Sequence, residues 1–140
     1  MDKRIEELFR DYGKSFSALD LHHTADLYAD QFIAAGPKGI ISQTREAFDK
    51  NAEKAADYYR QVGQKRAEIK SMKETWFGEQ YAMVTIHWGA YFEKLDEPYE
   101  FDVSYLVQLT GDKPRIILFI SHQDEEEAMN EVARLRQKAA

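Results

Sequence analysis

The strongest constraint on the fold is a change in hydrophobic period near Lys65. Before this residue, apolar side chains recur every three or four positions, the spacing that places them on one face of a helix. After it they recur at every second position, the spacing of a strand. Because the helices come first and the strands follow, the pattern predicts an α+β fold.

Three N-terminal segments carry the helical spacing. The first covers residues 5–19 and presents one apolar stripe opposite charged positions. A short second helix begins after Asp20, a residue type that caps helix N-termini. A longer third helix spans about residues 44–61, and Gly63 is placed to end it. Between the second and third helices, a Gly-Pro-Lys-Gly segment is typical of a turn between two short extended pieces.

Four strands follow the helices and are separated by short turns. They cover roughly residues 66–77, 80–93, 100–110 and 115–123. Since short connections join antiparallel neighbours, we expect these strands to form a meander. A short C-terminal helix begins after Asp124, which fits the N-cap position, and the three glutamates that follow complement the helix dipole.

Composition narrows the class of protein. The 140 residues suit one domain that covers the whole chain, 1–140. The net charge of −6 argues against nucleic acid or a membrane as partner, because both attract basic surfaces. The absence of cysteine excludes a disulfide scaffold, a thiol nucleophile and cysteine-based metal sites. Because we find no apolar signal segment and no apolar run of membrane-spanning length, we expect a cytoplasmic protein.

The segment 80–93 is apolar on both faces of the expected strand. The even-numbered positions form one face and include Ile86, Trp88 and Phe92. The odd-numbered positions form the other face and include Met83, Thr85 and His87. A half-exposed strand alternates more cleanly, so we expect both faces to be covered, one by helices and the other by a second subunit. The sequence therefore predicts a homodimer through the sheet, with the even-numbered residues at its interface.

The order of the elements and several short motifs resemble the nuclear transport factor 2-like superfamily. The motifs are Arg10-Asp11-Tyr12, Leu19-Asp20 and Leu27-Tyr28-Ala29-Asp30. They are similar to the first two helices of ketosteroid isomerase, a member of this superfamily, and the expected strands extend the similarity over nearly the whole chain. The resemblance implies a cystatin-like cone, in which a curved antiparallel sheet wraps around the N-terminal helices.

The catalytic residues of ketosteroid isomerase are only partly retained. By the resemblance, its aspartate base falls at Gly36 or nearby Ala35, and the acid of its oxyanion hole falls at Tyr105. Only the tyrosine of the first helix, Tyr12, is kept. An isomerase that moves protons needs a base, so this activity does not carry over. The sites of scytalone dehydratase and limonene epoxide hydrolase are not matched, whereas the small polyketide cyclases vary their acid–base residue.

A row of polar side chains forms the candidate site. The resemblance directs the strand face with His87 toward the cone interior. A register estimated from the turn centres places His87 opposite Tyr105, and Tyr105 opposite Ile120 or His122. Tyr12 faces this row from the first helix. Because imidazole can act as acid or base and a phenol can stabilise an oxyanion, the candidate catalytic residues are His87, His122, Tyr105 and Tyr12.

The expected pocket is mainly apolar. Its predicted lining is Phe16, Met83, Thr85, Val103 and Ile120. Three functions fit such a cone: binding of a small hydrophobic or aromatic ligand without chemistry, a cyclase, dehydratase or isomerase with a histidine base and a tyrosine oxyanion donor, or a dimerisation scaffold with a filled core. We expect no cofactor and no metal, since His22 and His23 are adjacent on a helix and point about 100° apart.

Overall fold

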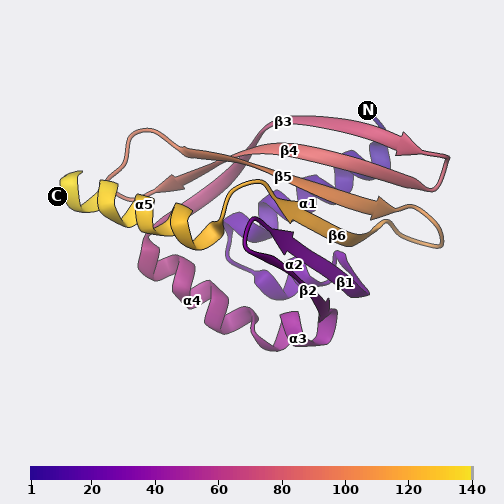
Figure 1. The fold of residues 1–140 in the computed structure, drawn as a ribbon, viewed down its shortest axis with the longest axis horizontal. Helices are drawn as coiled ribbons and strands as arrows, with labels where there is room; N and C mark the ends of the chain where they lie inside the picture. Colours follow the sequence, from indigo (N-terminus) through magenta and orange to yellow (C-terminus); the bar gives the residue numbers. More distant parts are fainter. Residues whose placement is uncertain (140) are drawn as a thin grey trace.

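The computed structural model describes residues 1–139 and has the predicted α+β architecture (Figure 1). Its helices are α1 (Lys3–Ser17), α2 (Leu21–Ala25), α3 (Arg45–Lys50), α4 (Ala52–Val62) and α5 (Glu125–Ala139). Its strands are β1 (Tyr28–Gly36), β2 (Gly39–Thr44), β3 (Gln64–Phe77), β4 (Tyr81–Phe92), β5 (Tyr99–Gln108) and β6 (Arg115–Ser121). No helix within residues 1–139 is both long enough and apolar enough to cross a membrane.

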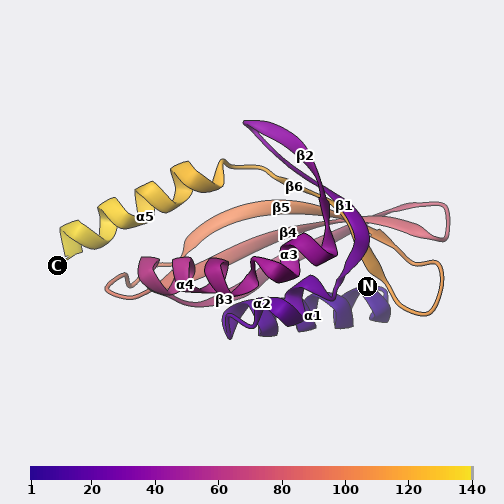
Figure 2. The ribbon, with the colours of Figure 1, turned by 90° about the horizontal axis from the view of Figure 1, so that it is seen from below.

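The strands of this described region form one sheet in the order β2-β1-β6-β5-β4-β3. The four strands from β3 to β6 make the predicted antiparallel meander. β1 pairs with β2 in antiparallel and with β6 in parallel, so the β1–β2 hairpin extends the sheet beyond β6. Figure 2 shows that the sheet is curved and that α1 to α4 lie on one side of it. The architecture is therefore the curved sheet around N-terminal helices that the sequence predicts.

Side-chain caps fix the ends of most helices, as the sequence predicts for two of them. The Asp20 carboxylate accepts a hydrogen bond from the His23 amide at 3.3 Å, and the Asp124 carboxylate accepts one from the Glu127 amide at 2.9 Å. Gly63 ends α4 with a left-handed φ of 91°. The expected single helix over residues 44–61 is instead two helices. They are separated at Asn51, a residue type that favours helix ends over helix interiors.

The helix α1 packs its apolar stripe onto the inner face of the sheet. Ile5 and Phe9 are fully buried in the main core cluster, together with Val84 and Ile86 of β4. Full burial of one such side chain stabilises the fold by roughly 1.5–3 kcal/mol, so this contact anchors the helix firmly. The packing sets the depth at which the next residues of the stripe, beginning with Tyr12, enter the cone.

The helix α5 is longer than expected and closes the other end of the cone. A second core cluster joins α5 to the end of β4 and comprises Ala90, Phe92, Ala128, Met129 and Val132. The guanidinium of Arg136 donates to the backbone oxygen of Val62 at the end of α4. The chain therefore continues from β6 into α5, which packs beside the end of β4 (Figure 1).

The β4 strand turns toward the core the face that we expected outside. Val84 and Ile86 are fully buried, whereas His87 is on the outer face. The physical reason is the turn after β4: Lys94 adopts a left-handed φ of 74°, and the chain reverses there rather than at residues 96–97. Tyr105 consequently pairs with Val84 instead of His87. The partner of Tyr105 thus moves by three residues along β4, and a shift by an odd number of residues exchanges the two faces of the strand.

The reversal overturns the predicted dimer contacts. Ile86, Trp88 and Phe92 are 0%, 3% and 0% exposed within one protomer. They belong to its own core and cannot contact a second copy, so their assignment to an interface is wrong. A second shift occurs on β6, where Ile117 is an extra residue in the ladder and Tyr105 pairs with Phe119 rather than Ile120 or His122.

Candidate functional site

The cone encloses a cavity of about 230 Å³. The sheet, α1, α3, α4 and α5 all contribute to its wall. Its deep part is mainly aromatic and includes Tyr12, Phe16, Tyr28, Trp88, Tyr105 and Phe119. The end near α5 is more polar and includes Tyr59, Gln64, Gln123, Glu125 and Met129. An apolar cavity with a few converging polar groups is the usual form of a small-molecule site.

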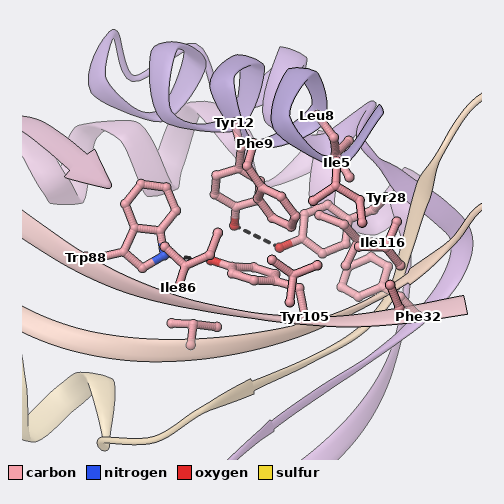
Figure 3. Close-up of a cluster of buried hydrophobic side chains, with 14 of the residues drawn as sticks. Ile5, Leu8, Phe9, Tyr12, Tyr28, Phe32, Ile86, Trp88, Tyr105 and Ile116 are labelled. Carbon is pink, nitrogen blue, oxygen red and sulfur yellow. Dashed lines mark hydrogen bonds between the residues drawn. The ribbon is translucent and has the colours of Figure 1, made fainter. Parts of the chain in front are cut away.

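The polar groups of the deep part are three phenols and one indole (Figure 3). The Tyr12 and Tyr28 hydroxyls are 2.8 Å apart and share a hydrogen bond. The Trp88 Nε1–H donates to the Tyr105 hydroxyl oxygen at 3.1 Å. The rings of Tyr12 and Tyr105 meet edge to face with centroids 5.4 Å apart, which brings the two pairs together. We call these four residues the tyrosine–tryptophan cluster.

The tyrosine–tryptophan cluster has a surplus of hydrogen-bond donors. Indole can only donate, so Trp88 fixes Tyr105 as an acceptor and leaves the Tyr105 proton for another oxygen. The linear series Trp88, Tyr105, Tyr12 and Tyr28 has at most three links for its four protons. At least one O–H therefore has no acceptor within the cluster, and a bound molecule can supply that acceptor.

Burial keeps these phenols protonated. It raises the pKa of Tyr28 and of Tyr105 well above the ordinary value of 10.0, and it also raises the pKa of Tyr12. The charged form of each phenol loses hydration in the apolar wall, whereas the neutral form does not. At neutral pH the deep end therefore presents neutral O–H donors and no phenolate.

The two strand histidines lie outside this cavity. His87 is on the outer face, where its Nδ1 is 2.7 Å from Asp102 Oδ1 and its Nε2 is 2.9 Å from Glu100 Oε1. His122 Nε2 is 2.8 Å from the Ser104 hydroxyl on that same face. The prediction that His87 and His122 join Tyr105 in the interior is therefore wrong. The hydrogen bond that the imidazole donates to Asp102, followed by the one that it donates to Glu100, raises the pKa of His87 above 6.5.

The structure places two of the five predicted lining residues at the cavity and the other three on the outer face of the sheet. Phe16 and Val103 line the cavity together with Tyr12 and Tyr105. Met83, Thr85 and Ile120 share the outer face with His87, because strand alternation places them with it, and Ile120 is 38% exposed. Tyr28, Trp88 and Gln64 line the cavity without having been predicted. With the even-numbered face of β4 pointing inward, the sequence would have predicted Trp88 as a lining residue.

Acidic groups occur only toward the α5 end among the described residues that line the cavity. Glu125 Oε1 accepts a hydrogen bond from the Tyr59 hydroxyl at 2.5 Å. Burial, and then the charge of Glu125, raises the pKa of Tyr59 well above 10.0. Asp102 is engaged by His87 at 2.7 Å. Within residues 1–139 no three metal-ligating side chains come together.

Comparison with solved structures shows the same fold in several proteins. An NTF2-like protein with a cystatin-like fold from Novosphingobium aromaticivorans is 14% identical, with a TM-score of 0.71 over 93% of this chain and 86% of that one. A Mycobacterium tuberculosis protein of unknown function is 14% identical, with a TM-score of 0.69 over 98% and 86%. The beta subunit of the benzoate 1,2-dioxygenase from Burkholderia mallei is also 14% identical, with a TM-score of 0.66 over 88% and 90%.

These identities establish a shared fold and no shared activity. No curated protein matches the sequence. A sequence model of the family described as NTF2-like protein (DUF6841) matches residues 2–124, which run from the cap of α1 to the cap of α5. The match thus includes the sheet and the helices inside the cone. The chain belongs to this NTF2-like family.

Proposed function

We propose that the protein binds a small aromatic molecule with a hydrogen-bond acceptor inside the cone. The observation that carries this proposal is the donor surplus of the tyrosine–tryptophan cluster in a mainly aromatic cavity. The cavity of about 230 Å³ is larger than the roughly 150 Å³ that accommodates benzene in a dry protein cavity. A ligand with one ring and one carbonyl group fits both the volume and the donors.

The contacts favour binding over proton transfer. Neutral phenol donors in an apolar wall stabilise a carbonyl oxygen, and they would also stabilise an oxyanion. A base must also reach the substrate, and both predicted histidine bases are on the other side of the sheet. Glu125 is bonded to the Tyr59 hydroxyl, and its charge also contributes to raising the pKa of Tyr12. The enzyme with a histidine base is therefore not the function we propose.

Calorimetric titration with acetophenone and ethylbenzene tests the proposal. The two molecules have nearly the same size, but only acetophenone carries an acceptor. We expect acetophenone to bind about tenfold more tightly, because one additional hydrogen bond in a buried site is worth about 1.4 kcal/mol. Equal affinities would show that the tyrosine–tryptophan cluster donates no hydrogen bond to the ligand. If neither molecule binds, the proposal is overturned.

We also propose that a second copy of the chain covers the outer face of the sheet. Alternation directs Met83, Leu106 and Leu118 to this face, where they pair across β4, β5 and β6. Ile120 adds a 38% exposed side chain beside them. A continuous apolar row of this kind is typical of a surface buried on association. These residues replace Ile86, Trp88 and Phe92 as the expected dimer contacts.

A further inference from the structure

We propose that Gln64 is a second polar anchor in the cavity, so that the preferred ligand is an aromatic molecule with an acceptor group at each end. This inference rests on the proposed binding function and specifies its ligand. Gln64 is the first residue of β3 and lines the cavity near α5. Its side-chain nitrogen Nε2 is buried and has no hydrogen-bond partner within residues 1–139.

An unpartnered amide nitrogen is costly inside a protein. Folding removes the water that bonds to it in the unfolded chain, and nothing replaces that bond. Most buried polar groups in native proteins have a partner, so an exception calls for an explanation. The Gln64 Nε2 is the buried side-chain polar atom that stands out in this way among the described residues. An acceptor on a bound molecule would supply the missing partner.

The position of Gln64 separates it from the tyrosine–tryptophan cluster along the cavity. Gln64 pairs with Phe92, four residues along β4 from Trp88. At the usual rise of a strand, this interval is about 13 Å. The two anchors therefore lie toward opposite ends of one cavity, with a distance between them that accommodates an aromatic ring and its substituents.

Small side chains keep the space between the anchors open. Ala67 of β3 pairs with Ala90 of β4 between Gln64 and the tyrosine–tryptophan cluster, and both alanines line the cavity. A larger side chain at either position would fill this part of the cone. The pair therefore makes an apolar floor over which a flat ring can lie.

The anchors also indicate the charge of the preferred ligand. The amide nitrogen and the phenols are neutral donors, so each favours an acceptor over a donor or a cation. The carboxylate of Glu125 also lines the cavity. A ligand carboxylate in the cavity would be repelled by this charge, so we infer that both acceptors of the ligand are neutral, as in a carbonyl group.

Titration with acetophenone and 1,4-diacetylbenzene tests this inference. We expect the intact protein to bind 1,4-diacetylbenzene about tenfold more tightly, since the second carbonyl reaches Gln64. Gln64→Met keeps the length of the side chain but removes the amide. We expect this variant to bind the two ketones within about twofold of one another. Gln61→Met, at an exposed position of α4, is the matched control and should keep the tenfold preference.

Thermal denaturation without ligand gives a second measurement. Because Gln64→Met removes an unpartnered buried donor, we expect its Tm to equal or exceed that of the intact protein. If acetophenone binds but 1,4-diacetylbenzene has no advantage, or if the variant weakens both ketones equally, the second anchor is refuted and the proposed function stands. If neither ketone binds, both proposals fail.

Discussion

The two faces of the central strands have opposite chemistry although the same strands form both of them. On the inner face of β4, Val84 and Ile86 are fully buried and the polar groups nearby are neutral phenols and an indole. On the outer face, Thr85 and His87 contact hydroxyls and carboxylates, and His87 keeps 37% of its side chain exposed. His87 and His122 are thus next to cavity-lining residues in the sequence, but the sheet separates their imidazoles from the cavity.

This difference shows that the face of β4 that points into the cone determines which chemical groups line the cavity. With His87 inside, the cone would contain an imidazole base. With Trp88 inside, it contains a donor that orients a phenol. Hydrophobic burial favours the observed arrangement, because the even-numbered positions from 82 to 92 are all apolar, whereas the odd-numbered ones include Thr85, His87 and Gly89. The chemistry of the cavity therefore depends on which face of β4 packs against the helices.

The sharpest way to test the two faces is to place one charge on either side of β4. We expect Val84→Asp to unfold the protein or to lower its free energy of unfolding by more than about 4 kcal/mol, because an unpaired carboxylate would enter the core. Thr85→Asp, one position further on the outer face, should cost no more than about 1 kcal/mol at protein concentrations where the chain is a monomer, because its side chain points away from the core. Urea denaturation measures both values, and equal losses would contradict the observed direction of β4.

The next largest effect is expected from a single hydroxyl in the tyrosine–tryptophan cluster. Tyr105→Phe leaves the Trp88 N–H without an acceptor, which should lower the free energy of unfolding by about 1–3 kcal/mol. The variant should also lose the preference for acetophenone over ethylbenzene. Tyr81→Phe removes an outer hydroxyl bonded to Gln108 and is the control. An undiminished preference in Tyr105→Phe would show that the cluster does not contact the ligand.

The outer face allows a test of association. Sedimentation over a series of protein concentrations should show a dimer for the intact chain and a monomer for Leu106→Lys, because a charge would enter the apolar row. We expect Gln61→Lys, at an exposed position of α4, to remain dimeric. The cavity is on the other side of the sheet, so acetophenone binding by Leu106→Lys should persist. A monomer at all concentrations of the intact chain would refute the proposed partner.

The smallest expected effect is a dependence of stability on pH. Asp102 and Glu100 raise the pKa of folded His87 above the unfolded value of 6.5, so the pairing contributes fully below that pH. Its contribution is lost as pH rises through the folded pKa. The difference in Tm between the intact protein and His87→Gln should therefore be larger near pH 6 than near pH 9. The exposed His23→Gln is the control, and a difference that grows with pH would have the wrong sign.

Much of the fold follows from local signals in the sequence. The α1 stripe, the caps at Asp20 and Asp124 and the end of α4 at Gly63 each depend on neighbouring residues, and the structure confirms them. The meander follows from the short turns between its strands. The resemblance to the superfamily correctly implies the cone. Local periodicity and turn chemistry thus predict the helices and the meander, whereas the cone follows from the resemblance and the β1–β6 pairing was not predicted.

The candidate site was less predictable because it depends on register. The odd-numbered face of β4 includes Thr85 and His87, and the resemblance directed it inward although the even-numbered face is more apolar. The expected turn centre agreed with that direction, and the left-handed Lys94 moves the centre. On β6 the extra residue Ile117 caused a further shift. Tyr12 lies in the apolar stripe of an amphipathic helix, and Tyr105 lies in a strand that alternates between apolar and polar positions from Tyr99 to Tyr105, so both point inward as predicted.

The parallel pairing of β1 with β6 affects how the chain acquires its shape during synthesis. Tyr28 emerges from the ribosome 88 residues before its partner Ile116. Contacts between such distant segments form slowly, because a long loop must close first. Until then, the hairpin of β1 and β2 has no sheet to join. A nascent chain that stops before β6 would therefore present an open, apolar interior to chaperones.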